Sequence, residues 1–352
     1  MSVRRIAALG ASLLCLSLAS VALAEPRVDR TVSIAPGGLY ELVFNPADNG
    51  IYIAAIGPLR AQGAARIIHL DGETLEQVEE IDVSGSPVFG LGLNVSSQTL
   101  YGTGTRDGRM SALDLRTGTL SVFGVEGEMP HLREVVVDEV SGRAYASVLG
   151  NNLGNAAAPA SLVWVIENGA VVRVIEIDAP ILAGLQLDAS RGRLFAAAMG
   201  AGEILVIDIE SGAVTRRFSS GAGRPTNLVH DAEGGRLLVA NQEGGLTVLD
   251  SETGALLQTV ATGEGALSVA YNPNVRQIYV TNRRAGTVSV IDSDTYRILA
   301  DLRTGTHPQS LAVDRRTNRV YVTNKAGDPP RGAADPGVWV DPQGDTLTVI
   351  LP

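Results

Sequence analysis

A repeated strand–turn–strand unit constrains this chain more than any other feature of its sequence. The clearest copy is IYVTNRRAGTVSVID at Ile278–Asp292, in which two short apolar strands flank the polar connection Asn282–Gly286. The related segments are VYVTN at Val320–Asn324, LLVAN at Leu237–Asn241, LFAA at Leu194–Ala197, AYAS at Ala144–Ser147, LYGT at Leu100–Thr103 and IYIA at Ile51–Ala54. Seven copies of one small unit predict a repeat architecture, in which each unit buries its apolar faces against its neighbours.

The spacing of the copies predicts the kind of repeat. A turn led by Asn or Asp follows the first strand of each unit, and consecutive turns lie 41 to 50 residues apart. These turns begin at Asn45, Asn94, Asp138, Asp188, Asp231, Asn272 and Asp314. That period is typical of a four-stranded propeller blade. We therefore predict an all-β fold, a seven-bladed β-propeller of four-stranded blades.

The two ends of the chain indicate how the ring closes. The last unit stops after its third strand, at Ile350, and so lacks an outer strand. The early segment Val28–Ile34 resembles an outer strand such as Gln258–Ala261. An unpaired strand edge would expose backbone donors and acceptors. We predict that the N-terminal strand completes the seventh blade, within a single propeller domain over residues 25–352.

The first 24 residues are typical of a secretory signal peptide. Arg4 and Arg5 precede an apolar run, and the small-residue site Ala22–Ala24 follows it. The run is too short for a membrane-spanning helix, so we expect no span in the mature chain. The only cysteine, Cys15, lies inside this run. We predict a periplasmic protein, cleaved near Ala24, that has no disulfide and is a monomer.

Two sets of recurring side chains have structural interpretations. Aspartates close the third strands, and a short Asp accepts backbone N–H bonds within its own turn; they are Asp114, Asp208, Asp250 and Asp292. An aromatic residue recurs in the second strands, where we expect it to fill the space between blades. These residues are Tyr52, Tyr101, Tyr145, Phe195, Tyr279 and Tyr321, with Leu238 as the exception.

Charge gives the strongest functional signal. Without Arg4 and Arg5 the chain has 26 basic residues against 38 acidic ones, which argues against general binding of polyanions. Long connections over 56–66, 149–161 and 325–345 are expected on one rim, together with the loops between blades. The candidate ligand-binding residues of that rim and the channel mouth are Arg106, His131, Arg133, Arg224, Arg283, Arg284, His307, Lys325 and Trp339.

The chemistry of these residues leaves an alternative open. Arginine forks suit phosphates and carboxylates, but nearby acids could make the same arginines ordinary surface ion pairs. Those acids are Asp107, Glu134, Glu243 and Asp328. The four histidines share no metal-ligand spacing. We therefore expect no cofactor and no metal, and we assign no catalytic residue.

The repeat IYVTNRRAGTVSVID, with VYVTN at Val320–Asn324, resembles the YVTN-repeat family of seven-bladed propellers, distant relatives of WD40 repeats. Three segments carry the resemblance towards its periplasmic members: GLYELVFNPADNGIYIA, RRAGTVSVIDSDTYRIL and THPQSLAVDRRTNRVYVT. The resemblance covers essentially the whole mature chain. It implies an exported, non-catalytic propeller with a capacity to bind single-stranded DNA.

Three functional hypotheses remain at this point. The first is a periplasmic binding module for a small ligand or single-stranded DNA, in which bases would stack on Phe89 or Trp339. The second is a lactonase-like hydrolase that uses His131 with Arg133 and Glu134, or His307. The third is a scaffold for an envelope protein. We expect the binding or scaffold propeller.

Overall fold

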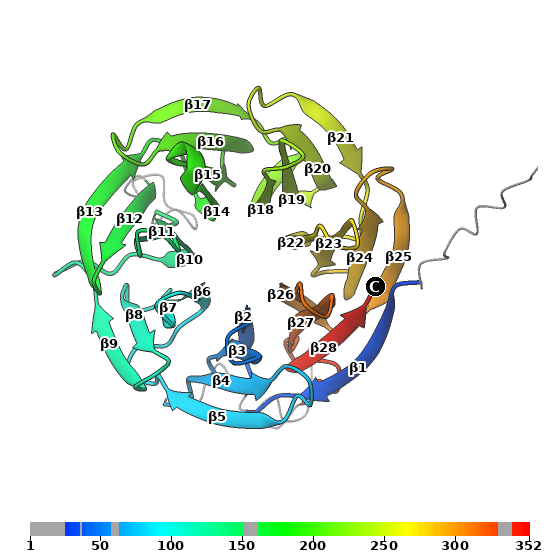
Figure 1. Cartoon of the computed structure of the whole chain (residues 1–352), viewed down its shortest axis with the longest axis horizontal. Coiled ribbons are helices and arrows are strands. Elements are labelled where there is room, and N and C mark those ends of the chain that lie inside the picture. The colour runs from blue at the N-terminus through cyan, green and yellow to red at the C-terminus, as the bar shows by residue number, and fades with distance from the viewer. Residues whose placement is uncertain (1–24, 36, 58–62, 151–160, 330–339) are drawn as a thin grey trace, which may run out of the picture.

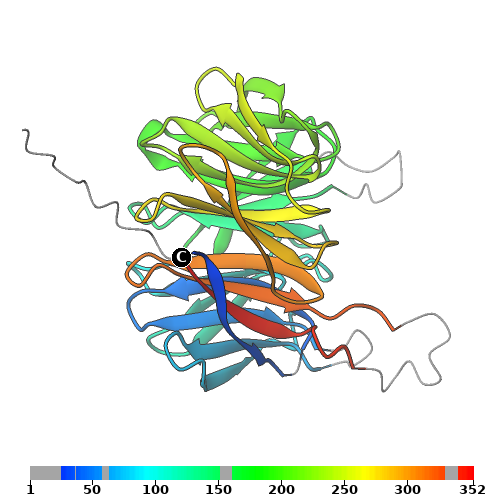
Figure 2. The same ribbon diagram turned by 90° about the vertical axis from the view of Figure 1, so that its right-hand side faces the viewer.

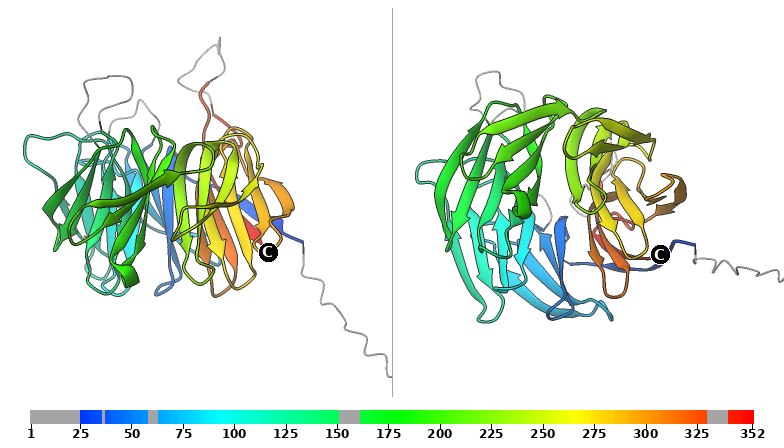
Figure 3. Two further views of the ribbon diagram at one scale, coloured as in Figure 1. Left: turned by 90° about the horizontal axis from the view of Figure 1, so that it is seen from above. Right: turned by 45° about the horizontal axis from the view of Figure 1, so that its top comes forward.

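Seven four-stranded antiparallel sheets stand like blades around a common axis (Figure 1). This arrangement is seen in a computed structural model that describes residues 25–35, 37–57, 63–150, 161–329 and 340–352. Seen from its edge, the ring is a disc whose thickness is the length of the blade strands (Figure 3). The predicted all-β fold and the number of blades are confirmed.

Six blades run from the axis outwards in chain order, and the seventh runs β26, β27, β28 and then β1. The inner strands are β2 (Leu39–Asn45), β6 (Gly90–Asn94), β10 (Leu132–Val137), β14 (Leu182–Asp188), β18 (Gly223–Asp231), β22 (Ala266–Asn272) and β26 (His307–Asp314). The second strands are β3 (Gly50–Ala55), β7 (Thr99–Thr103), β11 (Ala144–Val148), β15 (Arg193–Ala198), β19 (Arg236–Glu243), β23 (Gln277–Asn282) and β27 (Arg319–Lys325). The aliphatic repeat segments therefore form the second strand of every blade.

The outer half of each blade is more polar. The third strands are β4 (Arg66–Asp71), β8 (Met110–Asp114), β12 (Ser161–Glu167), β16 (Glu203–Asp208), β20 (Gly245–Asp250), β24 (Thr287–Asp292) and β28 (Thr346–Leu351). The outer strands are β5 (Gln77–Asp82), β9 (Thr119–Phe123), β13 (Ala170–Ile177), β17 (Val214–Ser219), β21 (Leu256–Val260), β25 (Ile298–Arg303) and β1 (Arg27–Ser33). A single 3₁₀ turn, η1 (Ala189–Arg191), joins β14 to β15.

The N-terminal strand closes the ring, as predicted. β1 lies antiparallel to β28, with Thr31 opposite Thr348 and Ser33 opposite Thr346. The hydroxyl groups of Thr31 and Thr348 are 2.9 Å apart and share a hydrogen bond. Figure 2 shows β1 beside β28 at the outside of the disc. The seventh blade is therefore built from both ends of the described chain.

The VTN segment of the repeat has a direct structural role. In the seventh blade, the Asn324 amide donates to the hydroxyls of Thr346 and Thr348, at 3.1 Å in each case, and so ties β27 to β28. The hydroxyl of Thr323 donates to the carbonyl of Tyr40 at 2.7 Å, which links the seventh blade to the first. The threonine thus joins neighbouring blades, and the asparagine joins two strands of its own blade.

The recurring aromatic residues fill the space between blades. Tyr145, Phe195, Tyr279 and Tyr321 are at most 1% exposed, and Tyr101 is 5% exposed. Trp164, in β12, is also fully buried. These rings recur at one place in the second strands of six blades, with Leu238 at the equivalent place in β19. They therefore form apolar surface between successive sheets. Their structural interpretation is confirmed.

The aspartate turns lie at the opposite end of the blades from the long connections. Asp292 accepts hydrogen bonds from the backbone N–H groups of Asp294 and Thr295, at 3.1 and 2.7 Å. Asp250 binds Glu252 and Thr253 in the same way. The turn glycine after Asp250, Gly254, has φ +74°, a conformation that favours glycine. These carboxylates therefore stabilise their own turns.

The strand register fixes which face carries the long connections. Leu39, at the start of β2, pairs with Ala55, at the end of β3. Leu132 pairs with Val148, and His307 pairs with Lys325. The segments that follow Ala55, Val148 and Lys325 therefore leave from the face where the inner strands begin. We call this the loop-rich face.

Candidate functional site

An irregularity recurs near the start of the inner strands. Pairing with the second strand shifts register at this height in six of the seven blades. In β2 the shift falls between Leu39 and Leu42. Such bulges turn side chains away from the regular alternation and are common beside binding sites.

One residue in each inner strand stands directly before that strand's buried Leu or Val. We call these seven the ring residues, and they are Glu41, Gly90, Glu134, Gly184, Asn227, Ser268 and Ser310. They occupy equivalent places in successive blades and so surround the axis close to the loop-rich face. Five of the seven have polar side chains.

Glycine occupies the ring position in two blades because neighbouring backbone lies too close for a side chain. A Cβ on Gly90 would lie 2.1 Å from the carbonyl oxygen of Arg133. A Cβ on Gly184 would lie 2.8 Å from the Cα of Asn227. Both distances are shorter than any ordinary contact. The blades of β6 and β14 therefore present only backbone at this position, and side chains from the other blades occupy the space near the axis.

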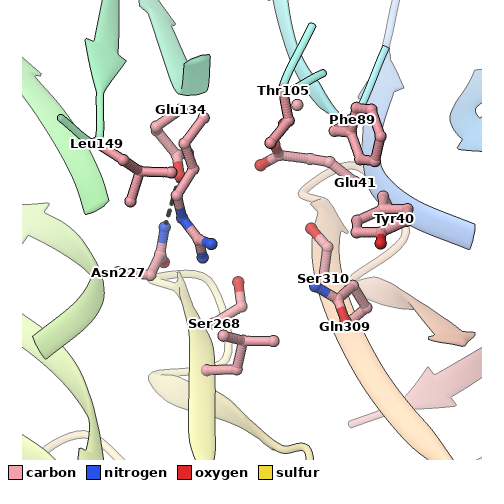
Figure 4. A pocket seen from close by; sticks show the side chains of 13 residues that line it. Tyr40, Glu41, Phe89, Thr105, Glu134, Leu149, Asn227, Ser268, Gln309 and Ser310 are labelled. Carbon is pink, nitrogen blue, oxygen red and sulfur yellow. Dashed lines mark hydrogen bonds between the residues drawn. The ribbon is translucent and has the colours of Figure 1, made fainter. Parts of the chain in front are cut away.

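The ring residues and their neighbours enclose a cavity of about 170 Å³ (Figure 4). Its lining comes from six inner strands and from the ends of two second strands: Tyr40, Glu41, Phe89, Gly90, Thr105, Arg133, Glu134, Leu149, Asn227, Leu267, Ser268, Gln309 and Ser310. A concave space with an aromatic wall and a few convergent polar groups is the usual form of a small-molecule site.

Two carboxyl groups share this cavity. Glu41 accepts a hydrogen bond from the N–H of Leu91 at 3.2 Å, and Glu134 accepts one from the Asn227 amide at 3.4 Å. Burial, and then the negative charge of Glu134, raise the pKa of Glu41 well above its usual value. Burial also raises the pKa of Glu134, while the Arg133 guanidinium opposes that rise.

The negative charge of Glu134 disfavours ionisation of Glu41, because two neighbouring carboxylates do not both ionise easily. The guanidinium of Arg133 opposes the rise in the pKa of both carboxyl groups.

Two cation–aromatic contacts form the wall of the cavity. The rings of Tyr40 and Phe89 meet edge to face, with centroids 4.8 Å apart. The Lys325 ammonium lies 4.1 Å from the centroid of Tyr40 and donates a hydrogen bond to its hydroxyl. The Arg106 guanidinium lies 5.5 Å from the centroid of Phe89. Cations over aromatic faces are held by the negative charge of the ring face.

Of the predicted site residues, Arg133 lines the cavity, and Arg106 and Lys325 lie against the aromatic rings of its wall. His307 lies close to them, at the start of β26. Burial and the positive charge of Arg283 lower the pKa of its imidazole. Arg283 and His307 therefore belong to one electrostatic group, next to the cavity but not among the side chains that line it.

The other predicted residues lie elsewhere. Arg284 forms an ion pair with Glu264 at 3.4 Å, and Arg224 donates to the Gln242 amide oxygen at 2.7 Å; both are exposed. His131 contributes its carbonyl to a hydrogen bond from the Leu149 N–H at 2.9 Å, and its imidazole does not line the cavity. Trp339 lies outside the described residues.

Within the described ranges, no three His, Cys, Asp or Glu side chains are placed to hold a metal ion. The described part of the chain also contains no helix with the length and hydrophobicity needed to cross a membrane.

The sequence alone did not single out Tyr40, Glu41, Asn227, Ser268 or Ser310. Each is a polar or aromatic residue in a short aliphatic strand, and each looks ordinary when its repeat is considered alone. The signal that could have found all of these except Tyr40 is the column of residues directly before the inner-strand Leu or Val, read across all seven repeats. That column is polar in five copies and glycine in two.

Comparison with known proteins agrees with this fold. Over 216 residues the chain is 28% identical to the uncharacterized protein YncE of Escherichia coli K12, and over 217 residues it is 29% identical to YncE of Salmonella typhi. Each match covers 58% of this chain and 58% of the relative's length. No protein-family model matches the chain. The seven-bladed ring shows a β-propeller, and over 58% of its length the chain is similar to the YncE proteins.

Proposed function

We propose that this chain is a non-catalytic binding propeller of the periplasm, and that it holds a small ligand in the cavity at the mouth of its channel. The observation that supports the proposal most directly is that side chains from separate blades converge on one cavity of about 170 Å³. Inner strands far apart in the sequence each contribute polar or aromatic groups there, while most of the inner-strand surface is aliphatic.

A ligand screen tests this proposal. Binding to the folded state raises thermal stability by mass action, so a library of small polar molecules should contain compounds that raise the melting temperature. Arg133→Ala removes a cation from the cavity wall, and Arg224→Ala removes one from the same face outside the cavity. We expect Arg133→Ala to abolish the stabilisation and Arg224→Ala to leave it unchanged. Equal effects of the two substitutions would place the ligand elsewhere.

Single-stranded DNA is a second candidate, favoured by the rings of Tyr40 and Phe89 with Lys325 and Arg106 against them. Bases stack on aromatic rings and phosphates pair with cations. A labelled oligothymidine should then bind with an affinity that falls steeply with salt, and the double variant Arg106→Ala/Lys325→Ala should weaken it. Fluorescence anisotropy that stays flat at 20 mM salt would exclude this candidate.

The proposed location rests on the signal-like first 24 residues, which lie outside the described part of the chain. Expression of the full chain with a C-terminal tag, followed by osmotic shock, tests it. We expect a shortened product in the periplasmic fraction. Retention of full-length product in the cytoplasmic fraction would contradict the proposed export.

A further inference from the structure

Acidic side chains outnumber basic ones in the lining of the channel cavity. Glu41 and Glu134 lie in its wall with a single guanidinium, that of Arg133. The other inner strands contribute uncharged groups at the same height, and among the lining residues there is no further charged side chain. Lys325 and Arg106 lie against the rings of Tyr40 and Phe89 and do not line the cavity. With both glutamates ionised, the lining would carry a negative excess.

A second observation points to a missing partner in the same place. Ser310 is 7% exposed and lines the cavity. Next to it in the lining, the amide oxygen of Gln309 is buried and has no hydrogen-bond partner among the described residues. Figure 4 shows Glu41 and Ser310 on one side of the cavity, with Glu134 and Asn227 on the other. Buried polar groups are nearly always hydrogen-bonded, so this unpaired oxygen beside the Ser310 hydroxyl is a place for a donor.

We propose that the cavity binds a small organic ammonium ion, whose N–H groups donate to the carboxylates of Glu41 and Glu134 and to the hydroxyl of Ser310. This inference rests on the proposed binding function and names the ligand class for the same site. An ammonium group has three donors and no acceptor, which matches two carboxylates and a hydroxyl. The rings of Tyr40 and Phe89 offer an apolar wall for the carbon chain.

The surroundings favour this class over the other ions. An anion would meet the negative charge of the glutamate pair at close range. A metal ion needs several ionised or carbonyl oxygens in a compact shell, and the described residues include no group of three acidic or histidine ligands. The guanidinium of Arg133 beside the pair also opposes a doubly charged ion. An organic ammonium spreads a single charge and uses directional donors.

The size of the cavity limits the ligand. One water molecule needs roughly 10–15 Å³ of such space, so about 170 Å³ has room for a small organic amine. Butylammonium is a suitable probe, because it has one charge and a short apolar chain.

An ammonium ion stabilises the doubly ionised pair and so opposes the raised pKa of Glu41. Where Glu41 is protonated in the free protein, it releases that proton to solvent as the complex forms. The affinity for butylammonium should consequently rise with pH, by up to tenfold per pH unit, for as long as Glu41 remains protonated in the free protein. The charged groups that face Glu41 are Glu134 and Arg133 from β10, since the side chains from β2, β18, β22 and β26 that also line the cavity are uncharged.

Isothermal titration calorimetry of the full mature chain with butylammonium tests the inference. Over a series from pH 5 to 8 we expect binding to wild type, with proton release wherever Glu41 is protonated in the free protein; the release is detected by comparing buffers of different ionisation enthalpy. Glu41→Gln and Glu134→Gln should each weaken binding at least tenfold, and Glu41→Gln should abolish the proton release. Glu243→Gln is the matched control, because Glu243 lies exposed at the end of β19 and does not line the cavity. It should leave the affinity unchanged within twofold.

Further binding measurements distinguish the ways in which the inference could be wrong. Tetramethylammonium, which has no N–H donor, should bind at least tenfold more weakly than butylammonium, and sodium and calcium ions should not compete at millimolar concentration. Circular dichroism of each variant establishes that it is folded. No binding of butylammonium, equal binding of tetramethylammonium, or binding that survives both glutamine substitutions would overturn the inference. If other molecules from the ligand screen still bind and are lost in Arg133→Ala, the proposed function stands and only the ligand class is wrong.

Discussion

Removal of one hydroxyl group should test how the first and last blades are held together. The Tyr321 hydroxyl, in β27, donates to the carbonyl of Gly72 in the turn between β4 and β5 at 2.7 Å. This bond joins the seventh blade to the first, and Tyr321 is fully buried. The Tyr321→Phe substitution removes only the oxygen. The ring still stacks on Phe44, whose centroid is 5.7 Å away.

The expected loss of stability comes from the Gly72 carbonyl, which no longer has a hydrogen-bond donor. A buried carbonyl without a partner costs about 1 to 3 kcal/mol of stability. The unfolding entropy of a chain of this length is about 0.7 kcal/mol per degree near the melting temperature. The melting temperature of Tyr321→Phe should therefore fall by about 1 to 4 °C.

Tyr101 provides the matched control, because it occupies the equivalent place in β7. It is 5% exposed, and its hydroxyl has no partner among the residues that the structure describes. Tyr101→Phe should change the free energy of unfolding by less than about 0.5 kcal/mol. Urea denaturation followed by circular dichroism measures both variants. If Tyr321→Phe loses no more than Tyr101→Phe, the bond to Gly72 does not hold the blades together and the reasoning is wrong.

Three further perturbations have defined outcomes. The pKa of Glu41 is higher in the folded protein than the value of about 4.5 expected in the unfolded chain, so the free energy of unfolding should decline as the pH rises through the raised pKa. Urea denaturation across a pH series should show a smaller decline for Glu41→Gln than for wild type. Trp164→Ala empties a fully buried site in β12 and should cost about 3 to 5 kcal/mol, measured in the same way. A chain that begins after Ser33 leaves the edge of β28 unpaired; analytical ultracentrifugation should show dimers or larger species, whereas persistence as a stable monomer would indicate that β1 is dispensable.

The fold could be predicted because its signals repeat. Each VTN or related segment is weak alone, but seven copies at a steady period leave few architectures that can bury them. Closure by the N-terminal strand could also be predicted, because the last unit ends at Ile350 without an outer strand while a strand-like segment precedes the first unit. Both predictions depend on pattern and count, which a sequence carries directly.

The cavity could be predicted only in part, because it depends on register and on distances between blades. Arg133 was selected for its charge, and it does line the cavity. Glu41 was passed over, because a lone glutamate in a strand gives no indication that it faces another carboxyl from two blades away. Arg224 and Arg284 carry the same charge as Arg133 on the same face, but their neighbours Gln242 and Glu264 engage them. The positions of the cations in the sequence indicated the loop-rich face, but which of them line the cavity depends on the three-dimensional arrangement.

The pairing of β1 with β28 imposes an order on assembly. A ribosome delivers β1 before all the other strands of the ring, so β1 has no partner until β28 has been made. Six blades can form from neighbouring segments in the meantime, and the final step must bring together residues more than 300 positions apart. Contacts of such long range are slow to form. A nearly complete propeller with one unpaired strand is thus an expected folding intermediate. A circular permutant that links β28 directly to β1 and opens a turn elsewhere should avoid this intermediate.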